Sequence, residues 1–110
     1  MPRDVQKVLD AYVRLLRAHF GGRLERVVLF GSYARAEATP DSDVDVLVVI
    51  DALAPGERGA AVDLAYDASR DGGPEAPLIT PLVWTRAEHL DRLSRERRIA
   101  LDIQREGIPL

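Results

Sequence analysis

The run from Val44 to Ile50, Val-Asp-Val-Leu-Val-Val-Ile, restricts the possible folds of this chain more than any other feature. It is almost continuously apolar, and Asp45 is its one polar member. A strand with one face in water alternates apolar and polar residues, whereas a strand covered on both faces is apolar along its whole length. We therefore expect a central strand here, in a sheet with helices packed against it.

Hydrophobic spacing and turn residues predict the other elements. Helical periodicity covers residues 3–19, and Gly21-Gly22 ends that helix. A strand is expected at about residues 26–30 and a helix at residues 57–70. A third strand follows at residues 78–84, where Pro81 favours an edge position or a bulge.

The last part of the chain is expected to be helical. Thr85-Arg86-Ala87-Glu88 matches a capping box and predicts a helix start. Residues 95–105 form either a continuation of that helix or a separate one, with Ile99 and Ile103 facing inward. The resulting fold class is α/β (α+β), a small mixed β-sheet covered by helices, and the prediction is a single domain over residues 1–110.

Composition narrows the function classes. The net charge of −3, from 15 basic and 18 acidic residues, gives no support to broad nucleic-acid binding. The chain has no cysteine, which excludes a disulfide framework and a thiolate metal site. Because no apolar run has the length of a membrane span and the first residues do not resemble a signal peptide, we expect a cytoplasmic protein with no membrane partner.

Asp43 and Asp45 are the strongest candidates for chemistry. Side chains alternate along a strand, so both carboxylates project from one side while Val44 points away. Unpaired carboxylates at the start of a buried strand carry a free-energy cost. The pair therefore indicates a divalent cation site, and Mg²⁺ is the hard cation that suits it.

A glycine-serine turn after the first strand is the second candidate. Gly31 allows close approach of a ligand to the backbone, and Ser32 offers a hydroxyl and an amide. Residues 32–37 are expected to form a turn of helix whose amides face a phosphate. Arg35 is either a phosphate contact or a solvated arginine, and Tyr33 is a core or surface residue more readily than a platform for a base.

Gly31-Ser32-x-Ala34-Arg35, followed by Ser42-Asp43-x-Asp45, resembles the motif of the minimal nucleotidyltransferases of the polymerase-beta-like superfamily. The resemblance covers nearly the whole chain, including residues 105–110 at its end. It implies the polymerase-beta-like nucleotidyltransferase fold, a nucleoside triphosphate as substrate and Mg²⁺ as cofactor. Asp43 and Asp45 would then be catalytic and metal-binding, and Gly31, Ser32 and Arg35 would contact the phosphates.

This chain departs from the family pattern at two places. Ala36 stands where the family often has glycine, and we expect it to be tolerated. The family also has a third carboxylate on the strand after the central helix, where it assists the second metal and accepts the proton of the attacking hydroxyl. Residues 77–84 contain no acid. Four acids near that strand are alternatives, and each is more readily a solvated side chain: Asp63, Asp67, Asp71 and Glu75.

The other polar side chains have simpler interpretations. His19 and His89 are far apart in sequence and are expected to be structural or surface residues. A basic cluster near the end of the chain indicates a solvated helix face, with a patch for phosphate or an acidic partner as the lesser alternative. Its members are Arg92, Arg95, Arg97 and Arg98.

Two functions follow from the resemblance. The first is Mg²⁺-dependent transfer of a nucleoside monophosphate, AMP by preference, from a nucleoside triphosphate to a hydroxyl of a partner protein. The resemblance implies a small helical HEPN-type partner and an antitoxin role. The alternative is a catalytically weak or inactive module that neutralises this partner by contact, and a nucleotide-sensing subunit is a third option. An exposed sheet edge leaves a homodimer or hetero-oligomer open.

Overall fold

A four-stranded sheet with β2 (Val44–Ile50) inside it organises the molecule. The computed structural model describes residues 1–110. The remaining elements, in chain order, are α1 (Arg3–Phe20), the 3₁₀ turn η1 (Gly21–Arg23), β1 (Leu24–Phe30), α2 (Glu57–Asp71), β3 (Ile79–Thr85), α3 (Arg86–Ser94), α4 (Arg98–Glu106) and β4 (Ile108–Pro109).

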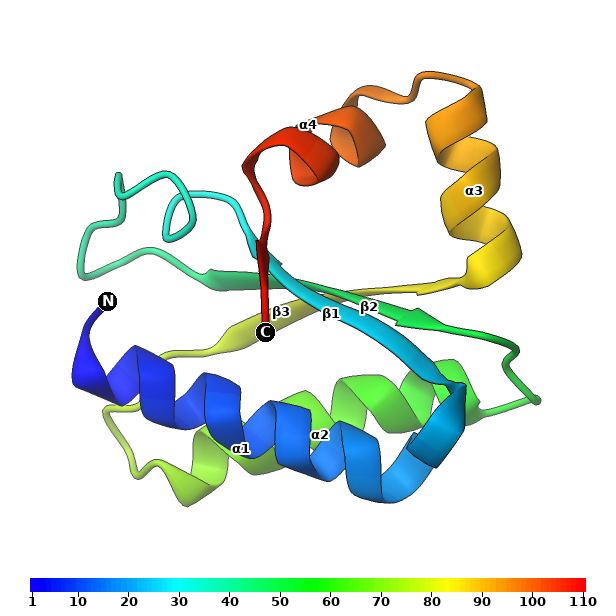
Figure 1. The fold of residues 1–110 in the computed structure, drawn as a ribbon. Coiled ribbons are helices and arrows are strands. Elements are labelled where there is room, and N and C mark those ends of the chain that lie inside the picture. The colour runs from blue at the N-terminus through cyan, green and yellow to red at the C-terminus, as the bar shows by residue number, and fades with distance from the viewer.

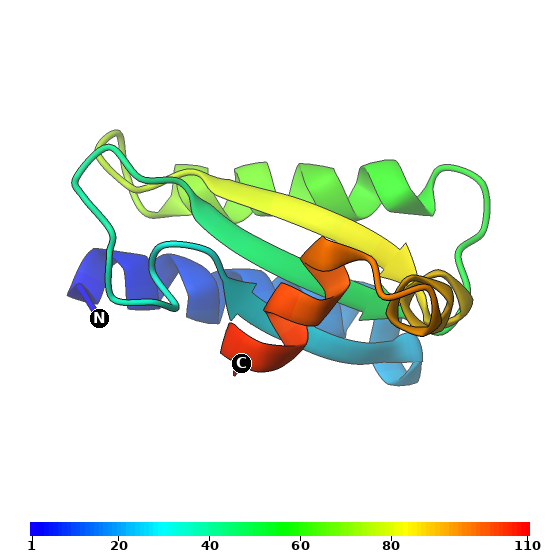
Figure 2. The ribbon, with the colours of Figure 1, turned by 90° about the horizontal axis from the view of Figure 1, so that it is seen from above.

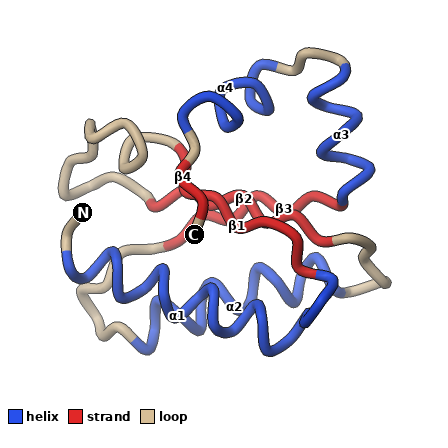
Figure 3. The backbone as a smooth tube through the Cα atoms, in the orientation of Figure 1, coloured by secondary structure: helices blue, strands red, loops and turns tan.

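The strand order is β3-β2-β1-β4. β1 pairs with β2 and β4 in antiparallel fashion, and β2 pairs with β3 in parallel fashion across α2. The sheet is therefore mixed, as predicted. Figure 3 shows in tan the connection between β1 and β2, which leaves the sheet at the end where β2 begins.

Helices cover both faces of the sheet. In Figure 1, α1 and α2 lie side by side below the strands, while α3 and α4 lie above them. Viewed from above in Figure 2, α4 crosses over the strands. The expected small mixed sheet covered by helices is confirmed. No helix in the structure is both long and apolar enough to cross a membrane.

The two faces are packed to different extents. The main core contains 18 buried residues, drawn from α1, α2 and alternate residues of the strands. The other face has 6 buried residues, among them Leu47, Val49 and Trp84 from the sheet and Ala100 and Ile103 from α4. The layer of α3 and α4 is therefore the more thinly packed of the two.

An ion pair joins η1 to the start of α2. The Arg23 guanidinium donates to both carboxylate oxygens of Glu57 at 2.7 Å, and the Ala54 amide donates to Oε1 of Glu57 at 2.7 Å. These contacts lower the pKa of Glu57 from 4.5 to about 2. These contacts hold the loop between β2 and α2 against η1.

This pair predicts how stability depends on pH. Because the folded-state pKa of Glu57 is depressed, its contribution is complete above about pH 4.5 and is lost as the pH falls toward 2. In chemical denaturation at several pH values, the stability difference between the wild type and Glu57→Gln is expected to shrink over this interval. Glu96→Gln, at an exposed glutamate without an ion pair, is the control, and an equal pH dependence in both variants would contradict the assignment.

Several elements differ from the sequence-based expectation. β1 begins at Leu24, two residues early, and β4 was not predicted because it has two residues. The final helix is separate from α3. Ile103 is buried, but Ile99 is 45% exposed, and Ala100 takes the inward position. The capping box at Thr85 is present as predicted.

Prolines occupy both edge strands at positions whose nitrogens face away from the sheet. The Val44 amide donates to the Leu78 carbonyl, so by alternation the even-numbered residues of β3 face β2 and Pro81 faces outward. On the other side, the Leu110 amide donates to the Val27 carbonyl, which places Pro109 outward by the same alternation. Neither proline removes a hydrogen bond from the ladder, and the edge position predicted for Pro81 is confirmed.

Candidate active site

Asp43 and Asp45 lie at the start of β2 on the face covered by α3 and α4. Leu47 and Val49, two and four residues after Asp45, belong to the core beneath those helices, so Asp45 shares their face. Asp43 is exposed and Asp45 is half-buried. Asp43 directly precedes the strand, and its charge acts on Asp45, so the two carboxylates lie near one another. Their connecting residue Val44 is buried in the main core on the other side.

Gly31 brings the backbone against Asp45. Phe30 is the partner of Asp45 in the β1–β2 ladder, so Gly31 follows directly where β1 ends. Its φ is +75°, and a Cβ atom here would overlap with Oδ2 of Asp45 and lie 3.1 Å from the carboxyl carbon. Any larger residue would have to displace the carboxylate, which gives a physical reason for glycine at this position.

The electrostatics of the pair favour a bound cation. Burial and the nearby charge of Asp43 raise the pKa of Asp45, while the positive charge of Arg35 acts in the opposite direction. The nearby charge of Asp43 therefore disfavours ionisation of the half-buried Asp45. A divalent cation would relieve this repulsion, and the all-oxygen donor set suits Mg²⁺.

The segment after Gly31 is a single tight turn and not a helix. The Arg35 amide donates to the Gly31 carbonyl at 3.2 Å, and the Glu37 amide donates to the Ser32 carbonyl at 2.9 Å. Ala36 then has a φ of +59°, which ends helical geometry. The expected turn is present, but it does not continue into a helix because the backbone reverses at Ala36.

Ala36→Gly is expected to stabilise the protein. A left-handed conformation costs a non-glycine residue roughly 1–2 kcal/mol, and the greater flexibility of glycine in the unfolded chain offsets about half of this. The expected net gain is about 0.5–1 kcal/mol, or a few degrees in Tm. Ala34→Gly, two residues earlier on the same turn and without a positive φ, is the matched control and is expected to lose stability.

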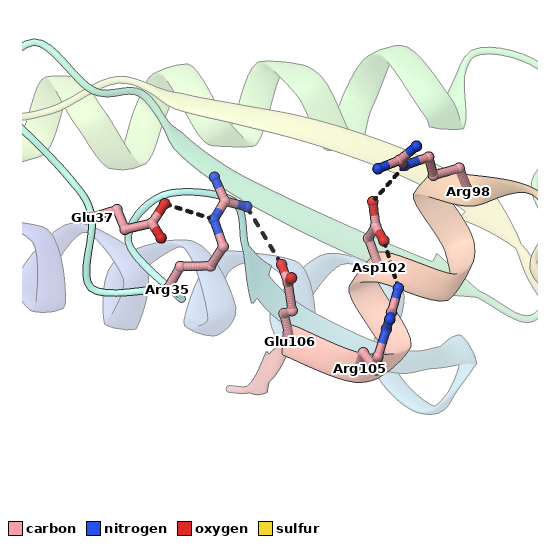
Figure 4. A network of polar contacts seen from close by, with 6 residues as sticks. All are labelled: Arg35, Glu37, Arg98, Asp102, Arg105 and Glu106. Carbon is pink, nitrogen blue, oxygen red and sulfur yellow. Dashed lines mark hydrogen bonds and ion pairs between the residues drawn. The ribbon is translucent and has the colours of Figure 1, made fainter.

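Arg35 is held beside the turn by two carboxylates (Figure 4). Its Nε donates to Glu37 at 3.1 Å and its Nη1 donates to Glu106, at the end of α4, at 3.4 Å. Both partners raise the pKa of Arg35. The arginine is therefore neither free in solvent nor turned away from the site. Glu106 could not be predicted as a partner from the sequence, because 71 residues separate it from Arg35.

The structure does not supply a third carboxylate. No group of three or more acidic, histidine or cysteine side chains lies close enough together to hold a metal ion. Among the alternatives considered above, Asp67 pairs with Arg70 at 2.5 Å, while Asp63 is exposed. Asp71 and Glu75 are exposed as well. The pair Asp43 and Asp45 therefore stands without a third acid.

The register identifies which β3 residue faces the pair. Thr80 is the ladder partner of Asp45, and Leu82 is the partner of Leu47. In a parallel sheet such partners share a face. Thr80 is exposed, whereas Leu82 is partly buried against the smaller core. Thr80 therefore occupies the position nearest the carboxylates on the neighbouring strand.

The other candidate side chains have structural contacts. Tyr33 packs against the main core, on the opposite face from Asp45. The ring centroids of His89 and Trp84 lie 5.8 Å apart. Burial and the positive charge of Arg26 lower the pKa of His89. The rings of His19 and Phe20 pack edge to face, with 4.6 Å between their centroids.

Three of the four arginines near the end of the chain have partners as well. Arg92 lies over the Trp84 ring at 4.8 Å, Arg95 pairs with Asp91 at 2.9 Å, and Arg98 pairs with Asp102 at 3.8 Å. These contacts favour the solvated helix face among the two interpretations of the cluster.

Known proteins resemble this chain in sequence and in fold. The family model described as the nucleotidyltransferase domain matches residues 9–103. The protein adenylyltransferase MntA of Thermococcus cleftensis is 47% identical over 45 residues, which is 41% of this chain and 43% of that protein. A protein from Methanocaldococcus jannaschii, provisionally named as a protein adenylyltransferase, is 41% identical over 46 residues, 42% of this chain and 46% of that protein.

These matches differ in what they cover. The matched stretches span less than half the length of either relative. A crystal structure from Sulfolobus solfataricus, provisionally named a nucleotidyltransferase, superposes with a TM-score of 0.54 over 96% of this chain and 78% of that one, at 19% identity, and it supports the fold. Because the family model spans most of the sequence, the chain belongs to the nucleotidyltransferase domain family.

Proposed function

We propose that the chain is a Mg²⁺-dependent nucleotidyltransferase that transfers AMP from ATP to a hydroxyl group of a partner protein. The observation that carries this proposal is the close approach of Gly31 to Asp45, which puts the glycine-serine turn beside that carboxylate. Membership in the nucleotidyltransferase domain family supports the reaction class.

The residues present fit a magnesium-bound triphosphate. Asp43 and Asp45 would hold the metal, and the amides and hydroxyl of Gly31 and Ser32 would contact the β- and γ-phosphates. Arg35 adds a positive charge that Glu37 and Glu106 keep in place. Mg²⁺, when bound, supplies neutralisation of phosphate charge. Transfers of this kind depend mainly on positioning and charge stabilisation, which a small domain can provide.

The transfer itself is a substitution at the α-phosphorus of ATP. The acceptor oxygen forms a new bond to that phosphorus, the bond from the α-phosphorus to the oxygen bridging to the β-phosphate breaks, and pyrophosphate leaves. The hydroxyl proton passes to a base. No third acid accompanies Asp43 and Asp45 to take this proton, so we expect slow transfer unless another group supplies the base.

The names of the relatives support a protein as acceptor, since the matched proteins are called protein adenylyltransferases. We propose a small helical HEPN-type protein as the partner and an antitoxin role for the modification.

A direct test incubates the purified chain with Mg²⁺, ATP labelled at the α-phosphate and a helical protein encoded beside it. The expected result is label on the partner, a mass increase of one AMP, and release of pyrophosphate. Label from ATP carrying the isotope at the γ-phosphate is expected to stay off the partner. Transfer of the γ-label would identify a kinase-type reaction and contradict the proposal.

The absence of a third acid supports a second candidate, a module that binds nucleotide and neutralises its partner by contact. The two candidates differ in one measurement. If the wild type suppresses the partner's toxicity without AMP on the partner, and Asp43→Asn suppresses it equally well, contact alone is the function.

A further inference from the structure

A cavity of about 410 Å³ lies next to the glycine-serine turn, between that turn and α4. Gly31 and Arg35 line it from the turn, and Glu106, which pairs with Arg35, lines it from the end of α4. Because Gly31 also lies against the Asp45 carboxylate, the cavity is next to that side chain. A triphosphate on the turn would therefore have the cavity directly beside it.

The floor of the cavity is apolar. Phe30 and Ile103 line it, and both pack in the smaller core. Ile99 lines it as well, although it is 45% exposed. Helical spacing predicted Ile99 as an inward residue, so its exposure leaves an apolar surface without a covering element. An aromatic ring and two branched aliphatic chains make a surface on which a planar heterocycle can stack.

The rim of the cavity is polar and carries both signs of charge. Arg98 and Asp102 line it side by side, with 3.8 Å between Arg98 Nε and Asp102 Oδ2. Asp102 also accepts from Arg105 at 3.0 Å, as Figure 4 shows. A nucleobase presents hydrogen-bond donors and acceptors along its edge, and a neighbouring guanidinium and carboxylate offer the complementary groups.

A larger cavity, of about 760 Å³, does not compete for this role. It is lined by Tyr33 and Ala34, which pack against the main core on the other side of the sheet. Gly31, which lines the cavity beside α4, does not line this one. A base in that cavity would lie on the face opposite to Asp45.

We infer that the cavity between the turn and α4 binds the base of the nucleoside triphosphate, with Ile99 as part of its apolar floor. The inference rests on the proposed function, since it assumes a triphosphate on Gly31 and Ser32. It adds a second contact region, formed by α4, that distinguishes a nucleotide from an inorganic phosphate chain.

Ile99→Gln tests this inference. Glutamine keeps a good helix former at an exposed site and removes the apolar surface. Leu90→Gln is the matched control, because Leu90 is 57% exposed on α3 and does not line the cavity. Titration calorimetry measures the affinity of the wild type and both variants for ATP and for inorganic tripolyphosphate, each with Mg²⁺.

The wild type is expected to bind ATP more tightly than tripolyphosphate. Ile99→Gln is expected to weaken ATP binding ~5-fold, the effect of losing about half the burial of one isoleucine, and to leave tripolyphosphate binding unchanged. Leu90→Gln is expected to change neither. If the wild type binds both ligands equally, or if Ile99→Gln keeps full ATP affinity, the cavity does not bind the base. Either result would leave the proposed phosphate site unaffected. Failure of the wild type to bind either ligand would overturn the phosphate site and the cavity together.

Discussion

Asp43→Asn combined with Asp45→Asn is expected to abolish Mg²⁺-ATP binding and to lower nucleotidyl transfer by at least roughly 10²-fold, the usual loss when a charge-stabilising group is removed. Both carboxylates are metal ligands in the proposed site, and no third acid lies near enough to replace them. Calorimetric titration of Mg²⁺-ATP and the label-transfer assay measure the two effects. Equal binding by the wild type and the double variant would remove the site assignment.

Two controls separate loss of binding from loss of folding. Asp41→Asn makes the same chemical change at an exposed residue of the preceding loop, and binding is expected to be retained. Asp45→Asn removes a charge whose ionisation is already disfavoured by burial and by Asp43. The Tm of its metal-free form is therefore expected to stay the same or rise. A fall of many degrees would indicate that Asp45 has a structural role instead.

Thr80→Asp is expected to raise the rate of nucleotidyl transfer by roughly 10²-fold, within the 10²–10⁴ range of general-base assistance. The substitution puts a carboxylate on the neighbouring strand, opposite Asp45 and on the same face. Thr80 is exposed, so the new charge stays solvated in the absence of metal. Single-turnover transfer at saturating ATP measures the change in rate, and ATP affinity is expected to change much less.

The controls for this gain come from the same strand. Thr80→Asn has a similar shape without the basic oxygen and is expected to give no increase. Leu82→Asp carries the same acid two residues later, where it packs against the smaller core, and is expected to destabilise the fold instead. Rapid transfer by the wild type that is lost in Asp63→Asn or Asp67→Asn would place the third acid on α2 and contradict the argument from β3.

The central strand and the carboxylate pair were predictable because they depend on local sequence. Val44 to Ile50 is apolar except for Asp45. A strand that is buried on both faces has apolar residues at nearly every position, so this pattern can be recognised in the sequence. The position of Asp45 on the face opposite to Val44 follows from strand alternation alone. The capping box at Thr85 is also local, since its two hydrogen bonds join residues three apart.

Features that depend on the register between distant segments were not predictable. Alternation along β3 does not show which of its residues faces Asp45, and only the pairing of β2 with β3 places Thr80 there. The ion pair of Arg35 with Glu106 depends on where α4 lies over β1. Ile99 was misplaced because helical spacing does not show which side of a short helix the sheet contacts, and Ala100 has the buried position.

The outward-facing prolines at the two sheet edges bear on how this protein behaves at high concentration. An incoming strand needs a row of free amides on the edge it joins, and Pro81 and Pro109 each interrupt that row. Arg58 interferes further on the β3 side, where its guanidinium donates to the carbonyl of Val83. Growth into fibrils by successive strand addition is thus blocked in both directions, and any oligomer of this chain is expected to be joined through side chains and to have a limited size.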